Sequence, residues 1–345
     1  MNRKGPADLK IRLVDPADEP AVDRAHAVQE AARAFDHPET APEGRRRFGG
    51  FLAQPPQDTQ VRCYLAEIGG TAAGVLVMHL LGKENAHYAE TEMAVHPDHR
   101  RRGVGTALLE RLLETAREEV RTEVVVLARI AVEGGPARIE TGARFLEKRG
   151  FTAALAEIDR SLRLDTVDPA AETRLWDESI GAAADYELVS WTGRTPEQYL
   201  EGLSRIDSQI FTEIPLGEVD LRPRTIDTAY VIARDDRAEA QGDTVIRTVA
   251  VHRPTGEIAA NTVIYIHGDE AHARQAITIV DPAHRGHRLG LLAKLANHRR
   301  LREHRPEVTT VWTGNADTNV HMAAINELLG FRPVDACVSY QRKLA

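Results

Sequence analysis

Cysteine is scarce in this sequence of 345 residues, which contains only Cys63 and Cys337, each inside a strand-like run. This usage favours two buried apolar thiols over a disulfide or a catalytic cysteine. Long apolar runs are also lacking, because none reaches the ~18 residues that a membrane helix needs. The opening stretch MNRKGPADLKIRL lacks the hydrophobic region of a signal peptide. We therefore expect a cytoplasmic enzyme or binding protein without a membrane partner.

Positive charge is in deficit. The 44 Lys and Arg residues are outnumbered by 52 Asp and Glu residues, which gives a formal net charge of −8 and a pI near 6.0. This balance argues against nucleic acid as a partner and mildly favours cationic or neutral acceptors over acidic ones. With 42% hydrophobic and 28% charged residues, the chain can build substantial cores. Its length suggests about two domains.

A duplicated pattern organises the sequence. The stretch AVHPDHRRRGVGTALLE (94–110) shares its layout with IVDPAHRGHRLGLLAKL (279–295), and ARFLEKRGF (143–151) corresponds to AAINELLGF (323–331). In the longer pair, an apolar run is followed by a proline, then by arginine and glycine, and then by a leucine-rich segment. Similarity over this length indicates a duplicated domain rather than the short unit of a solenoid.

The duplication sets the expected domain limits at 1–166 and 186–345, joined by a linking helix at 167–185 with Asp168 as its N-cap. In each domain, apolar periodicity predicts a first strand, two helices, a hairpin and a fourth strand. The repeated arginine and glycine turn then leads into a helix. A buried strand, a helix that ends at glycine and a closing strand complete the expected unit.

The turn after the fourth strand has the chemistry of an anion site. A helix N-terminus leaves up to four N–H donors free and carries about half a unit of positive charge. Glycine lets the backbone approach a ligand closely, and arginine adds fixed charge, so RRRGVG (100–105) is suited to a pyrophosphate. The alternative is a basic turn that is merely solvated. A Rossmann fingerprint would need glycine at Leu108, and a P-loop would not have Glu84 in GKEN.

Several strands, then V-x-P-x-x-R-x-x-G-x-G entering a helix, then F-L-E-K-x-G-F, together resemble the GNAT N-acyltransferase superfamily. The resemblance covers nearly the whole chain, twice, and the tandem arrangement is similar to that of mycothiol synthase. It implies two GNAT-like domains of the α/β (α+β) class, each a mixed, mostly antiparallel sheet flanked by helices. It also implies acetyl-CoA or another acyl-CoA as donor, with pyrophosphate on the turn and pantetheine along the end of the fourth strand.

The resemblance implies cofactor contacts in both domains. In the first domain they are Met93, Ala94 and Val95 for pantetheine, and Arg100, Arg101, Arg102, Gly103, Val104, Gly105 and Thr106 for pyrophosphate. In the second domain they are Thr278, Ile279 and Val280, and then Arg285, Gly286, His287, Arg288, Leu289, Gly290 and Leu291. Asn315 and Asn319 match asparagines that the family often has near the cofactor arm. A strand-end turn and a helix N-cap are equally open as their roles.

Transfer to an amine needs a base or a desolvating pocket, because an amine of pKa ~10.4 is only about one part in 2,500 neutral at pH 7. Glu90 and Glu92 of the first domain's fourth strand point to one face. Either carboxylate is therefore a candidate catalytic base, unless that face is only solvated. The second domain has Gln275 and Ile277 at these positions and lacks the carboxylate. A backbone N–H at the end of the strand is expected to stabilise the oxyanion.

Many family members have a tyrosine four residues before the final glycine of the glycine–phenylalanine pair, and it serves as the acid for the leaving thiolate. Leu146 and Asn326 occupy those positions here. The resemblance therefore assigns no acid, and Tyr88, Tyr340 and a water molecule stay open.

We therefore predict a tandem N-acetyltransferase that uses acetyl-CoA and acetylates an amine of a small molecule, as a monomer or homodimer and without a metal ion. Acetylation of a protein amine and a non-catalytic acetyl-CoA-binding sensor or scaffold stay open as alternatives. Arg288 stands where Gly103 stands in the first domain, at a position that calls for bare backbone. The first domain is therefore expected to bind CoA more tightly than the second.

Overall fold

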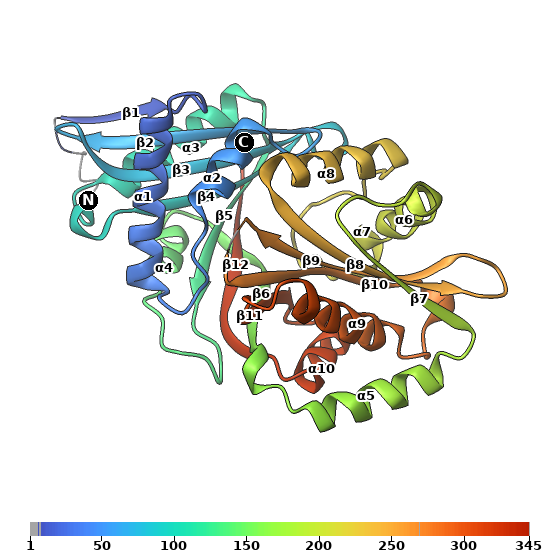
Figure 1. The fold of residues 1–345 in the computed structure, drawn as a ribbon. Coiled ribbons are helices and arrows are strands. Elements are labelled where there is room, and N and C mark those ends of the chain that lie inside the picture. The colour runs from blue at the N-terminus through green and yellow to red at the C-terminus, as the bar shows by residue number, and fades with distance from the viewer. Residues whose placement is uncertain (1–5, 7, 269, 345) are drawn as a thin grey trace. The chain divides into compact units, whose positions relative to one another are not determined.

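The computed structural model describes residue 6 and residues 8–268 and 270–344. The chain forms two compact units, each built around a β-sheet with helices on both faces (Figure 1). The first unit comprises Met1–Ala156, Leu216–Arg222 and Val334–Ala345, and the second comprises Glu157–Pro215 and Pro223–Pro333. Within the described residues, no helix is both long enough and apolar enough to cross a membrane.

The sheet of the first unit has the strand order β1-β2-β3-β4-β5-β12. Its strands are β1 (Leu9–Leu13), β2 (Thr59–Ile68), β3 (Thr71–Leu81), β4 (Tyr88–Val95), β5 (Glu123–Ile130) and β12 (Arg332–Lys343). The pair β4 and β5 is parallel, and each other neighbouring pair is antiparallel. The β2–β3 hairpin turns at Gly69 and Gly70, whose φ values of 58° and 84° are those of a type I′ turn.

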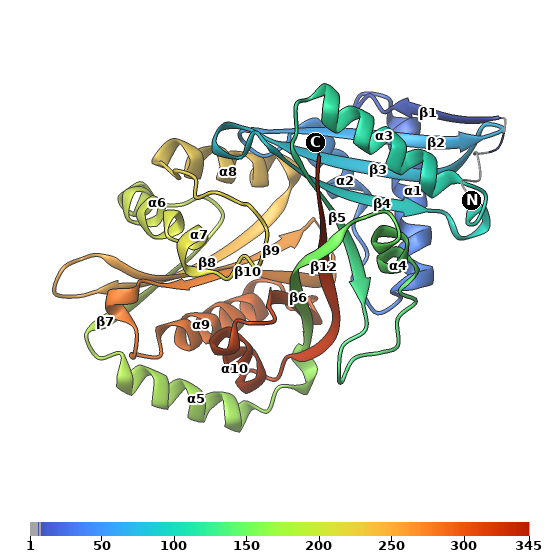
Figure 2. The ribbon, with the colours of Figure 1, turned by 180° about the vertical axis from the view of Figure 1, so that it is seen from behind.

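Helices α1 (Glu19–Asp36) and α2 (Arg45–Ala53) cover one face of this sheet, and α3 (Val104–Glu118) covers the other (Figures 1 and 2). Alternate side chains of β2 and β3 point toward α1 and α2 and form an apolar core with them. This core comprises Ala21, Val22, Ala25, Val28, Phe48, Leu52, Cys63, Leu65, Val75 and Val77. On the other face, a Cβ at Gly74 would lie 2.8 Å from side chains of both Val104 and Leu108, so this glycine admits α3. Helix α4 (Thr141–Glu147) follows β5.

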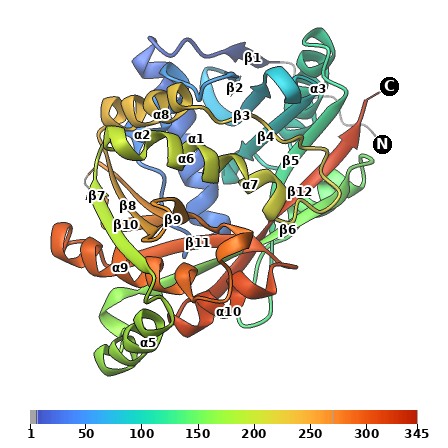
Figure 3. The same cartoon turned by 90° about the vertical axis from the view of Figure 1, so that its right-hand side faces the viewer.

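The second unit repeats this arrangement with the order β7-β8-β9-β10-β11-β6. Its strands are β6 (Thr152–Arg163), β7 (Tyr186–Thr192), β8 (Asp243–His252), β9 (Ile258–His267), β10 (His272–Val280) and β11 (Thr310–Ala316). Only β10 and β11 are parallel neighbours. Helices α6 (Leu200–Ser208), α7 (Ile210–Glu213) and α8 (Thr228–Gln241) lie on one face, and α5 (Pro169–Ala182), α9 (Leu289–His304) and α10 (Val320–Leu328) lie on the other (Figure 3).

The closing strands of the two sequence halves are exchanged. Strand β6, which ends the first half, pairs with β11 of the second unit, while β12, at the end of the chain, pairs with β5 of the first unit. The compact units therefore differ from the expected domains 1–166 and 186–345. Apolar alternation identifies a strand, but it does not say which sheet edge the strand completes, so the exchange left no signal in the sequence.

The linking helix has the predicted cap. Asp168 accepts a hydrogen bond from the Ala170 backbone N–H at 2.9 Å, and Pro169 opens α5. On the buried side of α5, the Arg299 guanidinium lies 4.0 Å from the centre of the Trp176 ring. Leu175 and Trp176 of α5 are partly buried against the core of the second unit, so the helix is not a free linker.

The predicted fold class is confirmed, since both units have a mixed, mostly antiparallel sheet flanked by helices. Neither cysteine forms a disulfide. Cys63 is buried, and burial raises the pKa of its thiol to about 12, so it remains a protonated, apolar group at neutral pH.

Candidate cofactor and acceptor site

Strands β4 and β5 separate partway along their length. Their parallel pairing runs from Tyr88 with Glu123 to Thr91 with Val126, and no later residue of β4 pairs with β5. On its other edge β4 stays paired with β3 as far as Val95. The backbone groups that face away from β3 over the end of β4 are therefore open to an added strand-like ligand. This is the segment, Met93, Ala94 and Val95, that the family resemblance assigns to pantetheine.

The turn after β4 holds two residues with positive φ. Gly103 is the N-cap of α3 at φ 89°, and Arg101 has φ 63°. No side chain caps α3, so the N–H groups of Val104, Gly105 and Thr106 remain available as donors. The arrangement can accept an anion at the positive end of the helix. Bare backbone at Gly103 was predicted, and the left-handed φ is its physical reason.

The three arginines of this turn have different roles. The Arg100 guanidinium donates to both carboxylate oxygens of Asp36 at 2.7 Å, and its Nε donates to the Val95 carbonyl at 3.1 Å. Arg100, predicted to contact pyrophosphate, thus ties the turn to the end of α1. Arg101 and Arg102 are exposed, and neither has an ion-pair partner in the described part of the chain. These two can supply positive charge to a bound anion.

Arg149 is a cation beside the turn that the sequence did not single out. Its Nη2 donates to the Thr106 hydroxyl at 3.0 Å, and its guanidinium lies 3.6 Å from the centre of the Phe145 ring. The Phe145 ring also lies 3.7 Å from the position that a Gly105 Cβ would occupy. Arg149 thus holds the first turn of α3 to α4. Its position just before Gly150 was the available signal, but a helix-ending arginine is common.

The candidate bases Glu90 and Glu92 lie on the α1 and α2 face of the sheet, as alternation along β4 requires. His79 pairs with Glu90 in the register of β3 and β4, and its ring makes an edge contact with Phe51 of α2, with 5.0 Å between ring centres. Burial lowers the pKa of His79, and the negative charge of Glu92 opposes that shift. His79 and Glu92 are therefore close enough to interact electrostatically, and Glu92 is exposed to solvent.

Glu43, which precedes α2, is a third acidic group of this face and was not predicted. Its carboxylate accepts a hydrogen bond from the Gln29 amide at 2.8 Å. Burial raises the pKa of Glu43 to about 7; the cation Arg47 opposes this, and the charges of Glu92 and Glu30 add to it. The negative charge of Glu92 thus acts on Glu43, and the charges of the two carboxyl groups would favour a cationic amine near them.

We expect Glu43→Gln to reduce the pH dependence of stability. Because the pKa of Glu43 is raised in the folded state, its contribution is fully present below the unfolded value of 4.5 and is lost as pH rises through about 7. Between pH 5 and pH 8 this loss amounts to about 1–3 kcal/mol, and the neutral Gln variant lacks it. Chemical unfolding of both proteins at the two pH values measures the difference. Equal losses in wild type and variant would contradict the assignment.

Neither tyrosine considered as the thiolate's acid has a hydroxyl in an open position. Tyr88 starts β4, at the end opposite the turn, and is 1% exposed; burial raises its pKa. The Tyr340 hydroxyl donates to Glu147 at 3.3 Å, and burial raises its pKa as well. The buried residue Leu146 occupies the usual tyrosine position. A water molecule stays the remaining candidate for the acid.

The second unit has the same strand separation. Strand β10 pairs with β11 only over His272–Arg274, which leaves Thr278, Ile279 and Val280 without β11 as a neighbour. The turn that follows also has two left-handed residues, Gly286 at φ 87° and Arg288 at φ 55°. No side chain caps α9, so Leu289, Gly290 and Leu291 present its first N–H groups.

The basic side chains of this second turn are bound within the unit. Arg288 pairs with Glu178 of α5 at 2.8 Å, Arg285 pairs with Glu213, and His287 Nδ1 lies 3.3 Å from the Ala182 carbonyl. Among the described residues, Arg100 is the one arginine of the first turn that is held in this way. The second turn therefore has less positive charge available for a ligand.

Asn315 and Asn319 have structural partners. The Asn315 side-chain oxygen accepts from Arg160 at 2.9 Å and from Asn326 at 3.1 Å, and its amide donates to the Ala316 carbonyl. The Asn319 side chain accepts from the Met322 N–H at 3.1 Å as the N-cap of α10. Asn319 therefore has the role of a helix N-cap. Asn315 lies in a buried polar network rather than in an open turn.

In the second unit, the sheet face under α6 and α8 corresponds to the face of the first unit that carries Glu90 and Glu92. Side chains of the second unit fill this face. Asp207 is fully buried; its oxygens accept from Arg234 at 2.7 Å and from Asn261 at 2.8 Å. Arg247 donates to Asn261 at 3.0 Å. The Asp207 carboxylate is thus engaged by Arg234 and Asn261, while Nη2 of Arg234 and Nη2 of Arg247 have no hydrogen-bond partner among the described residues. Gln275, which stands at the position of Glu90 in the repeated pattern, is buried on the opposite face of the sheet, toward α9, where its amide donates to the Thr262 hydroxyl at 2.9 Å.

We expect Arg288→Gly to strengthen CoA binding by the second unit severalfold, because the change removes a Cβ and a side chain from the position equivalent to Gly103. Titration calorimetry with CoA should then show a second site that is weak in the wild type. Glu178→Gln is the control, since it frees the Arg288 charge without removing the side chain. Two equal sites in the wild type, or CoA bound by the second unit alone, would contradict the predicted order.

The comparisons agree with this geometry. The sequence model described as the acetyltransferase (GNAT) family matches residues 26–151. Among solved structures, the chain is similar to a tandem GNAT protein from the clavulanic acid biosynthesis pathway, with 29% identity, a TM-score of 0.82, and 97% of this chain and 98% of that chain covered. A GCN5-related N-acetyltransferase from Sphaerobacter thermophilus has 16% identity and a TM-score of 0.66 over 99% and 97% of the two chains. The latter shows the fold alone. No curated protein matches the chain.

Proposed function

Because residues 26–151 form a GNAT acetyltransferase domain in a chain with the architecture of a tandem GNAT protein, we propose that this protein transfers an acetyl group from acetyl-CoA to an amine of a small molecule. The proposal concerns the donor, the acceptor class and the unit that does the chemistry. In it the first unit is catalytic, and the second unit has a weak or remodelled cofactor site.

The observation that carries the proposal is the open end of β4 beside an uncapped helix. Over Met93–Val95 the strand has β3 on one edge only, and Gly103 begins α3 at φ 89° without a side-chain cap. A pantetheine amide pairs with such a strand edge as an added strand would. A pyrophosphate fits the helix N-terminus, and Arg101 and Arg102 supply charge. The residues present therefore fit acetyl-CoA.

The carboxylate face supports an amine as the acceptor. Bound acetyl-CoA would supply the electrophilic thioester carbonyl. Glu92 is exposed on the face of β4 toward α1 and α2, and it takes the proton that the ammonium group must lose, directly or through a water. Backbone N–H groups at the end of β4 donate to the carbonyl oxygen as it gains negative charge. Glu43 and Glu92 together favour an acceptor that arrives as a cation.

Turnover of acetyl-CoA measured over a panel of amines tests this proposal. The panel should include small mono- and diamines, amino sugars, and peptides with free lysine or N-terminal amines. We expect CoA release with a cationic small amine and an acetylated product of the matching mass. Acetylation of peptides alone would favour a protein acceptor. Tight acetyl-CoA binding without turnover on any amine would favour a sensor or scaffold.

A further inference from the structure

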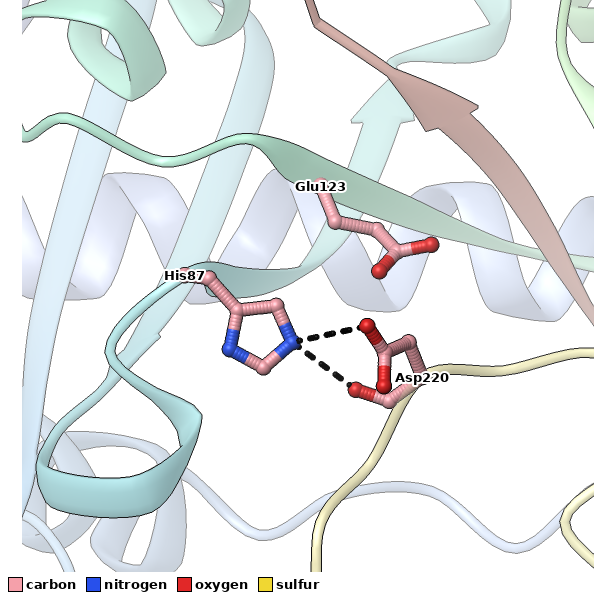
Figure 4. Close-up of side chains that lie close together, drawn as sticks. All are labelled: His87, Glu123 and Asp220. Carbon is pink, nitrogen blue, oxygen red and sulfur yellow. Dashed lines mark hydrogen bonds and ion pairs between the residues drawn. The ribbon is translucent and has the colours of Figure 1, made fainter.

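Three metal-ligating side chains meet in the first unit, at the end of β4 opposite the turn (Figure 4). They are His87, which precedes β4, Glu123, which starts β5, and Asp220 of the segment 216–222. One ligand atom from each lies within 4.8 Å of the other two. The His87 carbonyl accepts from the Glu123 N–H at 3.0 Å, so the starts of the two parallel strands hold two of the side chains together.

Glu123 gives this cluster an unsatisfied buried oxygen. The residue is 3% exposed, and its Oε1 has no hydrogen-bond partner in the part of the chain that the structure describes. Its carboxylate faces His87 and Asp220 (Figure 4). A buried, unpaired carboxylate oxygen is destabilising unless a cation or a donor satisfies it. The charges of Lys343 and Arg222 act on Glu123, but neither is a hydrogen-bond donor to Oε1.

The segment that carries Asp220 is fixed against the first unit by its own contacts. The Asn85 side chain donates to the Arg222 carbonyl at 3.0 Å and accepts from the Arg222 N–H at 2.8 Å. The Glu218 N–H donates at 2.8 Å to the carbonyl of Ala154, which lies in the first residues of β6, the part of that strand that belongs to the first unit. Val219 is buried with Tyr88. The position of Asp220 is therefore set by backbone contacts on both sides of it.

We propose that His87, Glu123 and Asp220 bind one divalent transition-metal ion of the Zn²⁺ class. One imidazole and two carboxylates form a mixed nitrogen and oxygen donor set that suits Zn²⁺ better than Mg²⁺ or Ca²⁺, which favour oxygen alone. Ligands about 2.1 Å from one ion lie at most about 4.2 Å apart, so the 4.8 Å limit of this cluster closes with small side-chain rotations. Asp220, with a half-exposed side chain, provides the route from solvent.

Metal binding changes one hydrogen bond of the cluster. His87 Nε2 lies 3.0 Å from the Asp220 backbone carbonyl and 3.5 Å from Asp220 Oδ2. As a ligand, Nε2 must offer its lone pair, so the imidazole proton moves to Nδ1 and the bond to the carbonyl is exchanged for the bond to the ion. Because the cluster lies at the start of β4 and the proposed donor site at its end, the ion fastens segment 216–222 and takes no part in acetyl transfer.

The full chain, treated with a chelator and dialysed, tests the site by titration calorimetry with Zn²⁺. We expect one Zn²⁺ per chain with saturable binding, and a rise in Tm that grows with the Zn²⁺ concentration. Asp220→Asn and Glu123→Gln should each weaken binding at least tenfold. The control is Glu84→Gln, which removes the same charge at an exposed position close to His87 in the sequence, and it should bind as the wild type does.

Cobalt provides a readout of the donor set that does not depend on stability. Co²⁺ bound by one imidazole and carboxylates should give visible absorption that is lost in His87→Gln, while far-ultraviolet circular dichroism shows that the variant is folded. Two results would overturn the proposal. One is that neither Zn²⁺ nor Co²⁺ binds saturably to the wild type. The other is that Asp220→Asn and Glu123→Gln bind the metal within twofold of the wild-type affinity. Either result would leave the acetyltransferase proposal untouched, because amine turnover is measured separately.

Discussion

Glu92→Gln is expected to lower kcat by roughly 10²–10⁴ while CoA affinity stays at the wild-type value. Glutamine keeps the shape of the side chain but cannot take a proton from the acceptor amine. The loss should shrink as pH rises, because a larger fraction of the amine is then neutral without a base. A pH profile of kcat with the best acceptor from the panel, together with CoA calorimetry, measures both parts of this prediction.

Two variants show whether the effect belongs to this position. Glu90→Gln alters the other carboxyl group on the same face of β4 and should have the smaller effect if Glu92 is the base. Glu118→Gln changes an exposed side chain on α3 and should leave kcat unchanged. Wild-type rates across the pH range in both Glu90→Gln and Glu92→Gln would remove these carboxylates from the mechanism.

Gly103→Glu is expected to weaken CoA binding by at least tenfold, about 1.4 kcal/mol. The change places a side chain and a negative charge at the N-cap of α3, where the proposed pyrophosphate contacts the backbone. It also forces a non-glycine residue to φ 89°, which is strained for an L-amino acid. Calorimetry with CoA gives both the affinity and the number of sites.

The matched control for that prediction is Gly70→Glu. Gly70 has φ 84° in the β2–β3 hairpin of the same unit, and nothing lies within 4 Å of a Cβ placed there. The control therefore adds the same charge and similar backbone strain away from the turn. If both variants lose CoA affinity equally, strain in the unit explains the loss, and the turn is not the donor site.

The sequence predicted the turn well because its physical requirement is local. A strand followed by glycine, arginine and an apolar helix constrains the backbone over only a few residues, and the left-handed φ of Gly103 follows from them. The two turns agree in backbone conformation as well as in sequence, because their left-handed residues are at equivalent positions. The left-handed residues of the first turn are Arg101 and Gly103, and those of the second turn are Gly286 and Arg288. Glycine and arginine are therefore exchanged between the two equivalent positions.

Contacts between segments that are distant in the sequence could not be predicted from local sequence patterns. The hydrogen bond of Arg100 to Asp36 forms because α1 ends beside the turn. The neighbouring arginine, Arg101, stays exposed. The pKa of Glu43 is raised chiefly by its burial in the folded chain, and the charges of Glu92 and Glu30 add to the shift. Asp220 comes from a segment whose sequence has no periodicity, yet it joins the first unit. Each of these three environments depends on a residue that is distant in the sequence, and a local sequence pattern cannot predict such a contact.

The exchange of β6 and β12 bears on how the chain folds during synthesis. The first half leaves the ribosome with β5 at an open sheet edge and with β6 lacking the strand it pairs with, because β12 and β11 are synthesised last. The sheet of the first unit is complete only when β12 emerges at the end of the chain, and β6 has to wait for β11, so folding is expected to be post-translational and to need shielding of exposed edges. For the same reason a polypeptide cut within α5 should not give two independent proteins, and separately produced halves are expected to complement each other.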